Sequence, residues 1–84
     1  MTYTYATSGT CAKQIDFELD GNIIKGVVFT GGCNGNLKGI SKLVEGMTAE
    51  EAIKRLRGIC CGSKTTSCPD QLALALEAAL EKQQ

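Results

Sequence analysis

Hydrophobic and polar residues alternate along the first part of the chain, which is the pattern of strands that bury one face. Two such stretches cover residues 2–7 and 12–19, and the more continuously apolar stretch 23–30 predicts a third, more buried strand. In the second stretch, Ile15, Phe17 and Leu19 share one face and polar residues share the other. Asp20-Gly21 marks a tight hairpin turn because glycine accepts a positive φ, and Gly26 indicates a β-bulge or a close approach. We therefore expect a three-stranded antiparallel meander.

Beyond the third stretch, apolar residues recur at helical intervals of three and four. Helices are expected over residues 36–44, from a cap at 48 to 58, and over 69–82. Thr48 followed three residues later by Glu51 is a capping box, and Pro69 fits only the first turn of a helix, where its missing N–H is not needed. Strands followed by helices predict one α+β domain over 1–84, with three helices packed on one face of the sheet.

Composition and charge narrow the class of protein. The 84 residues carry nine Lys plus Arg and nine Asp plus Glu, so no basic field favours nucleic acid, and none is expected as a partner. No apolar run approaches the ~20 residues of a membrane span, and the N-terminus lacks a signal-peptide pattern. A cytoplasmic protein with no membrane partner is expected, and the uncovered face of a small sheet favours a homodimer.

Five cysteines are the main candidates for chemistry: Cys11, Cys33, Cys60, Cys61 and Cys68. An odd count in a cytosolic chain favours metal ligands, redox thiols or packing over a disulfide framework. Cys11 precedes the expected hairpin and Cys33 follows it, so these positions should approach each other. Cys68 lies at or next to the N-cap of the last helix, where the helix dipole favours thiolate. If that helix docks on the sheet, three or four thiols converge, with Cys60 or Cys61 as the fourth. Such a set can bind zinc or an iron–sulfur cluster, or exchange disulfides.

Four neighbouring residues are candidates to support the metal ligands or to contact an anion: Gly32, Asn34, Ser67 and Asp70. A glycine-rich turn before a helix can present backbone N–H groups to an anion. This one lacks the lysine and the spacing of a P-loop, so a simple strand-to-helix turn is the main interpretation. Asp70 in the first turn of the last helix complements the helix dipole.

The run Thr66-Ser67-Cys68-Pro69-Asp70 resembles the signature of the TSCPD domain family. That domain is known as the C-terminal module of adenosylcobalamin-dependent ribonucleotide reductases and as short stand-alone proteins. The resemblance extends over nearly the whole chain. It implies a stand-alone accessory module related to deoxyribonucleotide synthesis, with a reductase or a thiol-redox protein as partner. The catalytic barrel and the cobalamin site of a reductase cannot fit in 84 residues, so reductase catalysis by this chain alone is not expected.

The order of the cysteines is also similar to that of the U-type iron–sulfur scaffold proteins. The matching features are Cys11, Gly32-Cys33, the segment 46–52 and Cys68 ahead of a Leu-Ala-rich helix. This chain departs from the scaffold pattern at two positions. The scaffolds carry an Asp two residues after the first cysteine, where this chain has Lys13, and a His just before the last cysteine, where it has Ser67. This resemblance implies an alternative function as an iron–sulfur or metal delivery scaffold. A third alternative is an interaction module whose cysteines only pack, since free cysteine behaves as a small hydrophobe.

Overall fold

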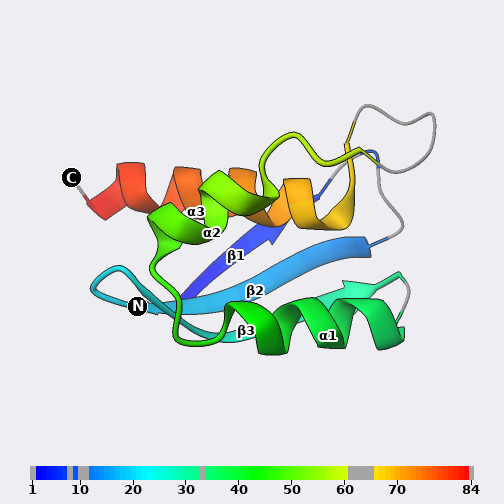
Figure 1. Cartoon of the computed structure of the whole chain (residues 1–84), viewed down its shortest axis with the longest axis horizontal. Helices are drawn as coiled ribbons and strands as arrows, with labels where there is room; N and C mark the ends of the chain where they lie inside the picture. Colours follow the sequence, from blue (N-terminus) through cyan, green and yellow to red (C-terminus); the bar gives the residue numbers. More distant parts are fainter. Residues whose placement is uncertain (1, 8, 10–11, 33, 61–65, 84) are drawn as a thin grey trace.

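The computed structural model describes residues 2–7, 9, 12–32, 34–60 and 66–83. The elements in chain order are β1 (Thr2–Ala6), β2 (Ala12–Asp20), β3 (Ile23–Gly31), α1 (Asn34–Val44), α2 (Ala49–Leu56) and α3 (Cys68–Gln83). Their bounds lie close to the predicted ones, and the largest shift at a start is in α1, which begins two residues earlier than expected. The predicted α+β fold, an antiparallel meander followed by three helices, is confirmed (Figure 1).

The sheet has the strand order β1-β2-β3, and both pairs of neighbours are antiparallel. Tyr3 lies opposite Phe17, and the two rings stack with their centroids 5.5 Å apart. Gly26 has a φ of +58°, and the register shift there sets Gly26 and Val27 of β3 against Phe17 of β2. This is the bulge that the sequence indicated, and it adds local twist to β3.

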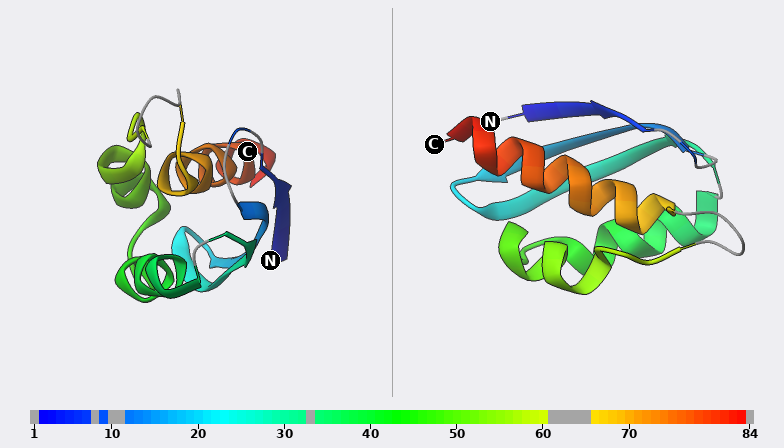
Figure 2. Two further views of the ribbon diagram at one scale, coloured as in Figure 1. Left: turned by 90° about the vertical axis from the view of Figure 1, so that its right-hand side faces the viewer. Right: turned by 90° about the horizontal axis from the view of Figure 1, so that it is seen from above.

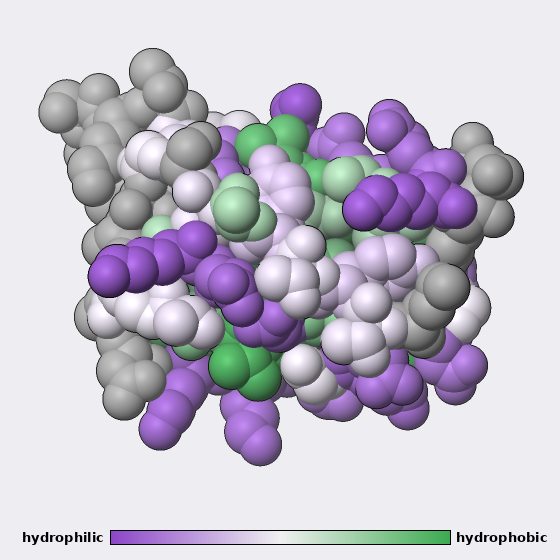
Figure 3. Space-filling view, turned by 180° about the vertical axis from the view of Figure 1, so that it is seen from behind, coloured by the Kyte–Doolittle hydropathy of each residue, from purple (hydrophilic) through white to green (hydrophobic). Residues whose placement is uncertain are grey.

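The helices cover one face of the sheet, as predicted, and the core lies between them (Figure 2). The core residues are Ile15, Phe17, Leu19, Ile24, Val27, Val44, Ala49, Ala52, Leu72, Ala75, Leu76 and Ala79. The opposite face carries polar side chains such as Thr4, which donates a hydrogen bond to Asp16 across 2.7 Å. Figure 3 shows that this face is mostly hydrophilic, with only scattered hydrophobic positions. Within the described ranges, no helix is both long enough and apolar enough to span a membrane.

The outer edge of β3 is occupied by the segment that joins α1 to α2. The N–H of Ile24 donates to the carbonyl of Met47 at 2.9 Å, and the N–H of Gly46 donates back to the carbonyl of Ile24 at 2.9 Å. Further along the strand, the N–H of Gly26 donates to the Glu45 carboxylate at 3.1 Å. These bonds pair backbone groups of Ile24 and Gly26 that an edge strand would otherwise expose.

The molecule is elongated, with extents of 34 × 21 × 20 Å. The start of β1, the β2–β3 turn and the end of α3 lie at one end of it, and the starts of β2, α1 and α3 lie at the other (Figure 1). A second, smaller apolar cluster sits at this other end and consists of Ala12, Leu37 and Cys68. Phe29 and Ile40 pack against it.

Candidate functional site

The first turn of α3 is closed by a side-chain cap from Ser67, the residue that precedes the helix. The Ser67 hydroxyl accepts a hydrogen bond from the N–H of Asp70 at 3.2 Å, which satisfies one of the donors that a helix start leaves open. The same hydroxyl donates to the carbonyl of Ile59 at 2.6 Å. Ser67 therefore ties the start of α3 to the chain that follows α2.

Asp70 makes a second tie between the same two segments. Its side chain is buried, with 7% of the residue exposed. One carboxylate oxygen accepts the N–H of Gly58 at 2.7 Å, and the other accepts the hydroxyl of Thr66 at 2.5 Å. The Thr66 hydroxyl in turn accepts from the amide of Gln71 at 3.0 Å.

The pKa of Asp70 lies below its ordinary value because its hydrogen bonds favour the ionised carboxylate. The bond from Thr66 contributes most and the bond from Gly58 comes next, while burial opposes them and Arg57 adds a smaller attraction. The polar residues of the Thr-Ser-Cys-Pro-Asp run thus bond within the chain and fix the position of the cysteine between them.

Cys68 is the first residue of α3 and is 7% exposed, packed in the cluster with Ala12 and Leu37. Gly32 approaches the same two residues. A Cβ added at Gly32 would lie 2.9 Å from a methyl of Leu37 and 3.1 Å from the backbone nitrogen of Ala12, and Gly32 has a φ of +78°. Only glycine meets both conditions without strain. Ala12 also pairs with Gly31 across the β2–β3 ladder.

The structure therefore brings Cys68 together with Ala12, Leu37 and Gly32, as expected if the start of α3 docks at this end of the sheet. Three of the predicted ligands, Cys11, Cys33 and Cys61, lie outside the described residues. In sequence, Cys11 adjoins Ala12 and Cys33 adjoins Gly32.

Cys60 and Asn34 are the remaining predicted positions. Cys60 is exposed, and its thiol donates to the carbonyl of Gly58 at 3.6 Å. Asn34 is the first residue of α1. Among the described residues, which include two of the five cysteines, no three metal-ligating side chains are grouped as a metal site. The ligand set therefore stays a prediction.

Thr66 and Gly58 were not among the predicted site residues. The sequence held a signal for part of this network, because Ser67 followed three residues later by Asp70 is the same capping pattern that was recognised at Thr48. The bond between Gly58 and Asp70 has no such signal, since the two residues are 12 positions apart.

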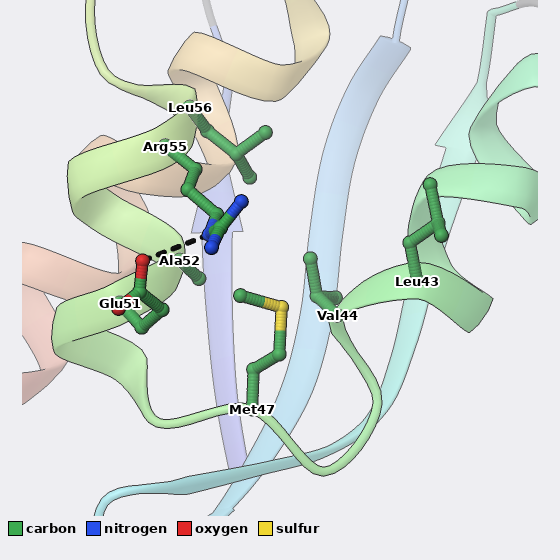
Figure 4. Close-up of a pocket in the computed structure, with 7 residues that line it drawn as sticks. All are labelled: Leu43, Val44, Met47, Glu51, Ala52, Arg55 and Leu56. Carbon is green, nitrogen blue, oxygen red and sulfur yellow. Dashed lines mark hydrogen bonds and ion pairs between the residues drawn. The ribbon is translucent and has the colours of Figure 1, made fainter.

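A hollow of about 560 Å³ lies between the end of α1 and α2, away from the start of α3 (Figure 4). It is lined by Leu43, Val44, Met47, Glu51, Ala52, Arg55 and Leu56. Its two charged residues, Glu51 and Arg55, form an ion pair with each other at 2.8 Å. Leu43 is 77% exposed at its rim. This groove offers mainly apolar contact, whereas the start of α3 holds the buried thiol.

Comparisons with known proteins gave one match, to a family model. Searches of curated proteins and of solved structures found no significant match. The family model of the TSCPD domain matches residues 1–80 of the 84-residue chain, which includes all six elements except the last residues of α3. This match supports the relation to the ribonucleotide reductase system that the motif implied. The chain is a member of the TSCPD domain family.

Proposed function

We propose that the domain is a thiol-site accessory module of the ribonucleotide reductase system, in which Cys68 acts together with Cys11 and Cys33. Cys60 or Cys61 supplies a fourth thiol. The site either binds zinc or an iron–sulfur cluster, or exchanges disulfides with a partner protein.

The observation that supports this proposal most directly is the meeting of Ala12, Gly32 and Cys68 at one end of the sheet. Consecutive Cα atoms are about 3.8 Å apart, so Cys11 and Cys33 are each one such step from a residue at this cluster. The Ser67 and Asp70 hydrogen bonds hold the backbone of Cys68 in place. A ligand fixed in this way loses little conformational freedom when it binds a metal or a partner.

The chemistry of the donors fits zinc or an iron–sulfur cluster, because both accept sets of cysteine thiolates and neither requires histidine, which the chain lacks. A bound metal would brace a small domain by linking the end of the hairpin to the start of α3. Cys11, Cys33 and Cys68 would hold it, with Cys60 or Cys61 completing the set.

In the redox form of the site, the cysteines alone carry the reaction. One thiolate attacks a disulfide of the partner and forms a mixed disulfide, and a second cysteine of the domain then attacks that bond. The partner leaves with two thiols and the domain retains one disulfide, so two electrons pass to the partner. Cys68 is buried, and Cys60 is the exposed cysteine among the described residues, so Cys60 is the better placed of these two for the first contact.

The test is metal content and thiol reactivity of protein purified without oxygen or added metal. We expect either near-stoichiometric zinc or iron, or a reversible internal disulfide, with loss of either in Cys68→Ser. Cys68→Ala controls for the buried hydroxyl of the serine variant, since both variants remove the thiol but only serine adds a polar group. A wild-type protein with no metal, no disulfide and five ordinary thiols would refute the proposal.

The burial of Cys68 against Ala12 and Leu37 also favours a second candidate, an interaction module with packing cysteines. Cys68→Val distinguishes the two, because valine restores apolar packing but cannot bind metal or form a disulfide. Under the packing function Cys68→Val keeps every partner and its stability. Under the thiol-site function it folds but loses metal or redox exchange.

A further inference from the structure

The two edges of the sheet differ in how they are protected. The edge of β3 is bonded by Gly46, Met47 and the Glu45 carboxylate, and it is kinked by the bulge at Gly26. β1 ends the strand order on the other side, and Figure 2 shows it along the outside of the molecule. Its sequence Thr-Tyr-Thr-Tyr-Ala has no proline, glycine or charged residue, which are the usual devices that prevent strands from adding to an edge.

We propose that the outer edge of β1 pairs antiparallel with β1 of a second copy of the chain. This pairing joins the two three-stranded sheets into one continuous sheet across a two-fold axis. Edge-strand addition is a common mode of recognition because main-chain hydrogen bonds supply the affinity.

The sequence of β1 is self-complementary when it is paired about its central residue, Thr4. Tyr3 then faces Tyr5 of the second copy, Thr4 faces Thr4, and Thr2 faces Ala6. Both tyrosines are half-buried and lie on the helix-covered side, where they line a small hollow together with Phe17 of β2 and Ala79 of α3. In the joined sheet, the helix-covered faces of the two strands therefore lie on the same side, and the tyrosines of one copy pair with the tyrosines of the other.

Charge also permits this pairing. β1 carries no charged residue, and the nearest acidic residues on the exposed face are Asp16 and Glu18 of β2, which lie opposite Thr4 and Thr2. In the paired sheet, the Asp16 residues of the two copies are separated by three strand spacings, or about 14 Å. This separation exceeds the Debye length of about 8 Å at physiological salt, so their repulsion is weak.

β1 is already held in the conformation that pairing needs. The Tyr3 ring stacks on Phe17, and the Thr4 hydroxyl bonds to Asp16, so both faces of the strand are fixed to β2. A short strand of five residues gives a small interface, and a weak dimer is therefore the expected state.

The test is sedimentation of the full chain over a concentration series up to about 1 mM, the range in which a weak dimer forms. NMR spectra of the same series should show concentration-dependent shifts at the amides of residues 2–6. Thr4→Lys places two lysines opposite each other in the dimer and should weaken self-association by up to about fivefold. In the monomer the new lysine faces Asp16, which favours folding.

Two further variants make the result specific. Thr30→Lys adds the same charge to an exposed position of β3 and should leave self-association unchanged. A mixture of Thr4→Lys and Thr4→Glu chains should form mixed dimers about tenfold more readily than either variant alone. A protein that stays monomeric at ~1 mM, or that dimerises with the amide shifts outside residues 2–6, would overturn the proposal.

Discussion

Removal of the Asp70 carboxylate tests whether the hydrogen bonds at the start of α3 hold the fold. Asp70→Ala deletes the acceptors for the Gly58 N–H and the Thr66 hydroxyl, at 2.7 and 2.5 Å. Hydrogen bonds to a charged group contribute about 1.5–3 kcal/mol each, so both together set an upper limit near 6 kcal/mol. Gly58 is exposed, and water can replace its partner in the variant, so we expect a loss of about 2–3 kcal/mol.

That loss is large for a domain of this size. A change of 1 kcal/mol moves the midpoint of a 60–100-residue domain by about 4–8 °C, so Asp70→Ala should lower the Tm by at least about 8 °C. Circular dichroism during heating and in urea measures this change. Asp20→Asn at an exposed site is the matched control and should change the free energy of unfolding by less than about 0.5 kcal/mol.

A double-mutant cycle separates the carboxylate–hydroxyl bond from general damage. Thr66→Val removes the hydroxyl at nearly constant volume, and the coupling between Thr66→Val and Asp70→Ala should be about 1–2 kcal/mol. If the two losses simply add, the bond contributes nothing to stability and the reasoning about this network is wrong.

Three other outcomes follow from the structure. The unfolding free energy should fall as the pH drops below about 4, because Asp70 and Asp16 both have lowered pKa values in the folded protein. Such a carboxylate stabilises the fold at pH values above its unfolded pKa, and this contribution is lost as the pH falls through its folded pKa. In an acid titration, the difference in unfolding free energy between Asp70→Asn and the wild type should therefore become smaller as the pH falls. Gly32→Ala should cost about 1–3 kcal/mol in urea unfolding, whereas Gly39→Ala, in α1 with open space around it, should gain up to about 1 kcal/mol. Thr48→Ala should cost about 1 kcal/mol by the same assay, and an unchanged midpoint would mean that its 3.2 Å bond to the Glu51 N–H is not a working cap.

The strands and helices were predictable because their signals are local. The alternation of Ile15, Phe17 and Leu19 fixed the buried face of β2, and Asp20-Gly21 fixed the register of the hairpin. The cap at Thr48 placed the start of α2 at the next residue. Each of these features depends on residues within a few positions of one another, so the local sequence is enough to predict it.

The site was predictable only in part, because its contacts link distant segments. The position of Cys68 at the start of α3 follows from Pro69, but its burial against Leu37 depends on how α1 docks beside β3. The bond from Gly58 to Asp70 likewise depends on the path of the chain after α2. The closed edge of β3 was not expected either, since it arises from backbone bonds by Met47 and Gly46 that carry no side-chain signal.

The placement of the two chain ends has a practical consequence for how this domain can be attached to something else. The start of β1 and the end of α3 share one end of a body 34 Å long, and the start of α3, which is Cys68, lies at the opposite end (Figure 1). A tether, a tag or a neighbouring domain joined at either terminus therefore leaves the cysteine-bearing tip pointing away from the attachment. The start of α3 is then presented about one domain length away from whatever carries the domain.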